Sequence, residues 1–451
     1  MDSTAVKPER CAQIPILSRL VKKLVDGLDN GSEIDGLFVL VIEMAKEWKK
    51  QAHVPYKKVV KLFEEDGTEE HKQLRILFHT LHRKTIRSLV LGMIPYDLSD
   101  EVSSNWNNIY SPDGAGTYLV GLSIDGRHGA FLSRDETKKV ISLLHGYKYG
   151  CETWVVKEAE DAYGNSQMTR PGERQLRLAL NIDNTMLPED KKWEEGVDDY
   201  CEPGCMSSGK DRTRNIEALI GMLGRRVDTD VDGGVHQLSS PVYVGCSHSV
   251  KKRMVSHDPE AGDMKSSSNV LRLLVSCIRY LGLKVIVHTI PICMVWEESQ
   301  IPLSEILVTV LAQSLISMNG LNVIQPGTNA KDVNQAVNER MKQHIWVKRP
   351  WFTENLEKSL ELRTNRSAIE SAWKKTQKRS DEELSQLLSE GQRLDDEVLK
   401  TWSKIRDAMK ESKAQTKYLK EEIQEADSFF ESASGMFPDL SDDDESDSDL
   451  E

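Results

Sequence analysis

The sequence lacks a long apolar run. The apolar stretch at residues 37–42 is followed at once by Glu43 and soon by Lys46, so it falls far short of the roughly 20 residues that a membrane-spanning helix needs. The first ten residues carry charges of both signs and no apolar segment of the kind that a secretory signal contains. We therefore expect no membrane insertion and an intracellular protein.

Cysteine is scarce and odd in number. The seven cysteines are scattered along the 451 residues, whereas a disulfide framework uses an even set in a short secreted chain. We expect reduced, structural thiols, which fits a cytoplasmic protein, with the nucleus as the alternative compartment.

Basic residues are outnumbered, 59 to 72, and the net charge is −13. Eight of the acidic residues lie in the segment 439–451, and without them the chain carries a net charge of −5. A mildly acidic body discourages indiscriminate nucleic-acid binding but leaves room for a local basic patch. The tail, residues 436–451, has little to bury and repels itself, so we expect it to be disordered.

The serines of this tail lie among acidic residues, a pattern that an acid-directed kinase uses, and phosphorylation would add further negative charge. Two interpretations stay open for the tail. It is either a solubilising segment or a docking segment for a protein partner.

The distribution of apolar residues predicts a mixed α/β fold in four parts. Residues 1–100 show helical spacing, as at Leu74, Leu77, Phe78 and Leu81. Residues 101–350 form an α/β body, residues 351–435 a long helical arm that is a candidate coiled coil, and residues 436–451 the acidic tail.

Within the body, short alternating runs predict strands and longer ones predict helices. Strands are predicted at residues 117–124, 176–182, 283–288 and 321–324, and helices at 269–280, 303–318 and 331–344. Helix and strand in alternation imply a partly parallel sheet covered by helices. Ligands of such sheets lie beyond the carboxyl ends of the strands, here at Glu297, Glu298 and the loop 325–330.

The arm places apolar residues near heptad spacing, with charged residues between them. They are Leu384, Leu387, Leu394, Val398, Ile405, Ala408 and Leu419. This pattern predicts a homo-oligomer held together by the arm. The alternative is a helix folded back on its own body.

One loop carries a compact chemical signal, because glycine and cations precede a helical stretch. Backbone N–H groups and a helix dipole at such a place can face a phosphate, while lysine and arginine add charge. The predicted phosphate-binding residues are Gly204, Ser208, Gly209, Lys210, Arg212 and Thr213.

The segment 205–213 resembles the signature loop of the cysteine-dependent inositol-polyphosphate phosphatases, in which a cysteine and an arginine bracket a Ser-Gly-Lys-Asp core. The resemblance implies that Cys205 is the thiolate nucleophile, Arg212 the phosphate clamp, Lys210 a phosphate ligand and Asp211 a candidate acid. The family keeps five residues between cysteine and arginine, and this chain has six.

Three other interpretations of the loop remain. Gly204 to Lys210 also matches the G-x-x-x-x-G-K frame of nucleotide-binding loops, with Asp211 in place of the magnesium-binding serine or threonine. A polar turn that caps the next helix is the simplest alternative. A zinc site built from Cys201, Cys205, Cys246 and His248 has suitable ligand types but irregular spacing. We predict no resident metal or cofactor.

One patch interleaves cations with aromatic side chains, the combination that binds single-stranded nucleic acid. It contains Lys342, His344, Trp346, Lys348 and Arg349. A further basic cluster contains His248, Lys251, Lys252 and Arg253. Together these features favour a binding and assembly protein of the nucleocapsid or viral-factory type. It would self-associate through its arm, contact single-stranded RNA and hold an anion in its loop, with a phosphatase or a nucleotide-binding protein as alternatives.

Overall fold

The computed structural model describes twelve stretches of the chain: 18–48, 57–99, 114–161, 168–194, 200–205, 212–227, 232–259, 264, 267–323, 326–327, 350–377 and 381–434. The chain forms two compact units, Met1–Leu362 and Arg363–Glu451. Within the described residues, no helix has both the length and the apolar content that are needed to cross a membrane.

The N-terminal part of the first unit is helical, as predicted. Its helices are α1 (Arg19–Asp29), α2 (Ile34–Glu47), α3 (Lys57–Glu64), α4 (Glu69–His79), α5 (Arg83–Leu91) and α6 (Ile94–Ser99). The side chains of Ser18 and Thr68 cap α1 and α4 by accepting hydrogen bonds from backbone N–H groups of the first turn. Gly92 ends α5 in the left-handed conformation, with φ of 65°.

The sheet is small and antiparallel, so the prediction of a partly parallel sheet was wrong. Its strands are β1 (Gly116–Ile124), β2 (Tyr243–Ser247) and β3 (Val285–Met294), in the order β2-β1-β3. The central strand β1, which confirms the prediction for 117–124, is buried along its whole length and pairs antiparallel with both neighbours. The ligand site predicted at Glu297, Glu298 and 325–330 rested on parallel strands and loses that basis.

Two other predicted strands were wrong. The run at 176–182 lies in helix α9 (Arg170–Asn184), which begins after the cap Thr169. Its buried face contains Leu176, Ala179, Leu180 and Asp183, a spacing of three and four residues that belongs to a helix. The segment 321–324 contributes only an isolated bridge from Asn322 to Leu315.

The remaining regular elements of the first unit are helices. They are α8 (Arg134–Asp161), the 3₁₀ helix η3 (Glu189–Lys191), α10 (Arg212–Val227), α11 (Val250–Val255), α12 (Asn269–Tyr280) and α13 (Gln300–Ala312). Helix α12 confirms the prediction for 269–280, whereas α13 ends earlier than predicted, because Gln313 adopts a left-handed conformation. The helix predicted at 331–344 lies outside the described residues.

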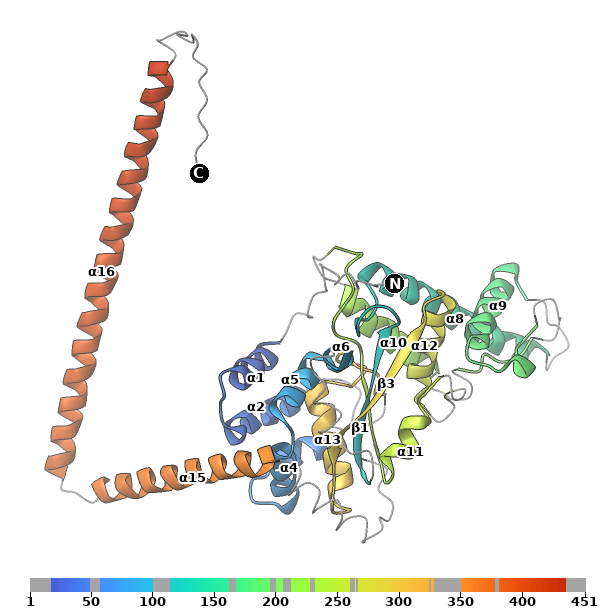
Figure 1. Cartoon of the computed structure of the whole chain (residues 1–451), viewed down its shortest axis with the longest axis horizontal. Helices are drawn as coiled ribbons and strands as arrows, with labels where there is room; N and C mark the ends of the chain where they lie inside the picture. Colours follow the sequence, from blue (N-terminus) through green and yellow to red (C-terminus); the bar gives the residue numbers. More distant parts are fainter. Residues whose placement is uncertain are drawn as a thin grey trace, which may run out of the picture. The chain divides into compact units, whose positions relative to one another are not determined.

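Helix α13 lies between the N-terminal helices and the sheet (Figure 1), where it packs against α2, α4 and α5 and against all three strands. Twelve of its thirteen residues are buried. A helix that is apolar around most of its circumference belongs in an interior. The helical part and the sheet therefore share one hydrophobic core.

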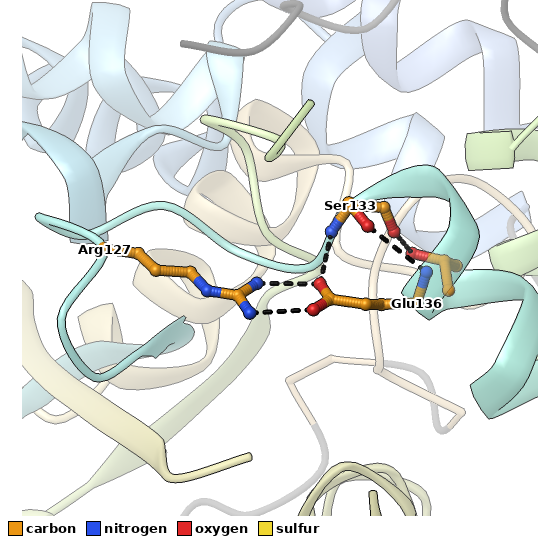
Figure 2. Close-up of polar contacts among 4 residues, drawn as sticks. Arg127, Ser133 and Glu136 are labelled. Carbon is orange, nitrogen blue, oxygen red and sulfur yellow. Dashed lines mark hydrogen bonds and ion pairs between the residues drawn. The ribbon is translucent and has the colours of Figure 1, made fainter. Parts of the chain in front are cut away.

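The start of α8 is fixed by the polar cluster in Figure 2. The Ser133 N–H donates to the Glu136 carboxylate at 2.8 Å, and the Glu136 N–H donates to Ser133 Oγ at 3.2 Å, which is a capping box. Arg127 adds two parallel hydrogen bonds of 2.7 Å to the same carboxylate. This arrangement ties the turn after β1 to the first turn of α8.

The C-terminal helices are α15 (Pro350–Gln377) and α16 (Asp381–Ser434). The first turns of α15 bind the corner between α4 and α5. The indole of Trp351 donates to the Thr80 carbonyl and the amide of Asn355 to the His79 carbonyl, both at 3.1 Å. Phe352 is fully buried there. The acidic tail, 436–451, lies outside the described residues.

Candidate functional site

The predicted anion-binding loop begins next to a buried carboxylate. Asp183 of α9 is 4% exposed. It accepts hydrogen bonds from the Tyr147 hydroxyl, at 3.0 and 3.1 Å to its two oxygens, and from the backbone N–H groups of Gly204 and Cys205. The first two N–H groups of the predicted cradle therefore already bind a carboxyl group, and that group belongs to the chain itself.

The thiol of Cys205 lies in the same buried cluster. It is fully buried, and its sulfur lies 3.5 Å from the Ser276 hydroxyl of α12. Burial and the nearby charge of Asp183 raise the pKa of this thiol well above its ordinary value and outweigh the opposite effect of the Arg272 guanidinium. A thiolate nucleophile needs a lowered pKa and access for a substrate. These surroundings favour a structural thiol.

Most of the other loop residues cannot be placed against Cys205. Ser208, Gly209, Lys210 and Asp211 lie outside the described residues, and so does the side chain of Arg212, the first residue of α10. Thr213 is half-buried in the first turn of that helix. The phosphate-binding roles of these residues, and the catalytic roles of Arg212 and Asp211, stay predictions.

The four ligands of the alternative zinc site do not form a cluster. Cys205 lies beside Asp183, whereas Cys246 of β2 donates to the Glu305 carboxylate of α13 at 3.3 Å. Over the described part of the chain, no group of three or more histidine, cysteine or acidic side chains is arranged to hold a metal ion. The zinc alternative is therefore wrong for these residues.

A second buried polar cluster joins α11 to the sheet. His257 is fully buried, and its ring nitrogens lie 2.6 Å from Ser267 Oγ and 3.1 Å from the Tyr118 hydroxyl of β1. Arg253 also donates to that hydroxyl, at 3.3 Å. Burial, aided by the charge of Arg253, lowers the pKa of His257 to about 4. The imidazole is therefore neutral at pH 7 and acts as a cross-link.

The predicted basic patches are placed only in part. Lys251 and Lys252 are exposed on α11, while Arg253 is half-buried against Tyr118. Lys342, His344, Trp346, Lys348 and Arg349 lie outside the described residues. Nucleic-acid contact through either patch stays a prediction.

The sequence reasoning missed a row of arginines on α9, because it read part of that segment as a strand. Arg170, Arg174 and Arg177 follow one another at steps of four and three residues, which places them on one face of a helix. With Tyr280 from the end of α12 they line an open groove of about 560 Å³.

Helix α16 carries a row of apolar side chains with no cover among the described residues. We call Val398, Trp402, Ile405, Met409, Leu419 and Ile423 the α16 seam. Their exposed fractions are 52, 63, 45, 59, 55 and 59%. Val398, Ile405 and Leu419 were among the predicted arm residues. Trp402, Met409 and Ile423 were missed, although they repeat at seven-residue steps that are visible in the sequence.

Comparisons with models of protein families, with characterised proteins and with solved structures give no match.

Proposed function

We propose that this chain is an assembly protein that self-associates through the α16 seam. One observation supports this proposal above all others: a helix of 54 residues presents a periodic apolar face to solvent. A helix of that length spans about 80 Å. Isolated helices derive little stability from propensity alone, and in proteins an apolar face normally packs against a partner.

The spacing of the seam indicates which kind of partner fits it. Successive seam positions alternate between steps of four and three residues, from Val398 to Trp402, Ile405 and Met409. Ser412 and Thr416 continue the same register before Leu419 and Ile423. This is the a/d pattern of a coiled coil, whose partner must be a helix with the same period. A second copy of α16 meets that requirement.

The flanks of the seam support an assembly of more than two helices. Leu387, Leu394 and Ala408 occupy three of the g positions, and Leu399 occupies an e position, which widens the apolar face. Broad faces of this kind suit bundles, whereas strict a/d faces suit two-stranded coils. The opposite face is charged and paired within the helix, as in Lys417 with Glu421 at 3.6 Å.

The energetics make the seam sensitive to single changes. Burial of each seam side chain contributes about 1.5–3 kcal/mol, or on the order of 10 kcal/mol for one chain. The loss of translational and rotational freedom on association costs roughly 4–15 kcal/mol. Because gain and cost are of similar size, a charge in the middle of the seam is expected to dissociate the assembly.

The test is the molar mass of the full chain by size-exclusion chromatography with light scattering. We expect the wild-type chain to be an oligomer and Ile405→Asp to be a monomer. Ala414→Asp is the matched control, because Ala414 lies on the opposite face of the same helix, nine residues away, and should leave the mass unchanged. A monomeric wild type would refute the proposal. So would an oligomer that Ile405→Asp leaves intact, because its interface would lie elsewhere.

A further inference from the structure

The groove on α9 lies on the first unit. It is lined by Arg170, Arg174, Arg177 and Asn181, which share one face of the helix, and by Tyr280. Helix α9 packs against α8 and α12 through its other face (Figure 1). Its cationic face is therefore open to a ligand.

The groove carries a net positive charge, because three arginines outnumber the one carboxylate in its lining, Glu173. Arg177 donates to Glu173 at 2.9 Å, and Glu173 also accepts a hydrogen bond of 2.6 Å from the Tyr200 hydroxyl, so this carboxylate is engaged. Arg170 and Arg174 are exposed. Across the described ranges, the guanidinium of Arg174 has no hydrogen-bond or ion-pair partner. Exposed guanidinium groups in a row are a chemistry that proteins use for phosphates.

Aromatic rings flank these cations. Trp193 and Tyr200 stack with ring centroids 6.3 Å apart and an angle of 25°. The guanidinium of Arg177 lies 5.3 Å from the Tyr200 ring and 6.0 Å from the Trp193 ring. Tyr280, at 40% exposure, presents its ring within the groove itself. Rings and guanidinium planes of this kind are the surfaces on which unpaired bases stack.

The arginines alone would suit any phosphate, and the aromatic rings narrow the choice of ligand. A phosphorylated peptide would use the arginines but would leave the aromatic surface without a role.

We propose that this groove binds single-stranded RNA, with Arg170 and Arg174 on successive phosphates and Tyr280 under a base. The two arginines are separated by a rise of about 6 Å along α9. A duplex is not expected, because its bases are stacked on one another and are not free to stack on Tyr280. The inference is independent of the α16 seam.

The test is fluorescence anisotropy of a labelled 12-nucleotide uridine RNA with the full chain, at several salt concentrations. For Arg170→Glu with Arg174→Glu, we expect affinity to fall by about tenfold or more. The slope of log affinity against log salt should be smaller by about 1.4, since each phosphate contact in a single strand contributes about 0.7. Circular dichroism checks that the variant is folded.

The matched control reverses two exposed lysines outside the groove, Lys284 and Lys358, which are 72% and 57% exposed. The charge change is identical, and affinity should change little. Both pairs are also measured in the Ile405→Asp background, so that a loss of assembly is not mistaken for a loss of RNA contact. Equal losses in the groove and control variants would overturn the proposal, as would no binding by the wild type at 50 mM salt.

Tyr280→Ala separates base stacking from simple attraction of a polyanion. We expect a loss of about fivefold or more for the single strand. Unchanged affinity for Tyr280→Ala, together with equal binding of an RNA duplex of the same length, would reduce the groove to a polyanion surface and overturn the proposal. A phosphoserine peptide that displaces the RNA at equal concentration would assign the groove to phosphoproteins instead, which would also overturn it.

Discussion

Replacement of Glu136 by glutamine should destabilise the first unit through the polar cluster at the start of α8 (Figure 2). The side chains of Arg127 and Glu136 are 16% and 20% exposed, so solvent screens their ion pair only weakly. Burial by itself raises the pKa of Glu136. The hydrogen bonds from Arg127 and Ser133 and the charges of Arg127 and His236 outweigh it and lower the pKa from 4.5 to about 2.

This pKa shift sets the magnitude and the pH range of the effect. A pKa lowered from 4.5 to about 2 corresponds to about 3 kcal/mol of stability at pH 7. Because the folded-state pKa is depressed, this stability is fully present above the unfolded pKa, near 4.5, and is lost as the pH falls towards 2. The difference in unfolding free energy between wild type and Glu136→Gln should fall from about 3 kcal/mol at pH 7 to about 1.4 kcal/mol at pH 3.

Urea unfolding of the full chain at both pH values, followed by tryptophan fluorescence, measures this difference. Asp125→Asn is the control, because it removes an ion pair with Lys284 whose side chains are 49% and 72% exposed. A pair of this kind is worth at most about 0.5 kcal/mol after screening by solvent. A Glu136→Gln chain as stable as the wild type at pH 7, or a difference that stays the same at pH 3, would refute the reasoning.

Two further predictions concern the cluster around Asp183. Asp183→Ala should lower the free energy of unfolding by about 3 kcal/mol, because the Tyr147 hydroxyl and two backbone N–H groups lose their buried partner. Urea unfolding measures this free energy, and a loss below about 1 kcal/mol would contradict the assigned contacts. In the native chain, a thiol reagent should label the exposed Cys201 well before the buried Cys205; peptide mass spectrometry reports the order, and rapid labelling of Cys205 would revive the nucleophile hypothesis.

Local periodicity predicted the helical parts of the fold well. The N-terminal helices and α12 each bury an apolar face, and that spacing is visible in the sequence. Helix α9 was predicted as a strand because Leu176, Leu178 and Leu180 alternate with polar residues. The burial of Asp183, one turn further on, reveals the helical face, but burial is not visible in a sequence.

The local pattern of apolar residues did not predict the topology of the sheet. The partly parallel sheet was inferred from helices and strands that alternate in sequence, but β1 pairs with β2 and β3, whose nearest ends lie more than 100 residues further along the chain. The short strand β2 gave no clear alternating signal. Pairing between such distant segments depends on how the whole core packs. A short segment of sequence therefore cannot predict it.

The surroundings of the predicted anion-binding loop, which begins at Gly204, were likewise not visible in the sequence. Its glycine, lysine and arginine predicted an anion site from residue types alone, and that site stays a prediction. The carboxylate that binds the first two N–H groups comes from Asp183, more than 20 residues earlier. Only the packing of α9 against α8 and α12 brings it there.

The position of α13 has a consequence for the synthesis of the chain. Helices α2, α4 and α5 leave the ribosome about 200 residues before the helix that covers their apolar faces. At roughly 5–20 residues per second, this interval lasts about 10–40 s. During this interval the nascent N-terminal helices expose apolar surface. We therefore expect ribosome-associated chaperones to bind them.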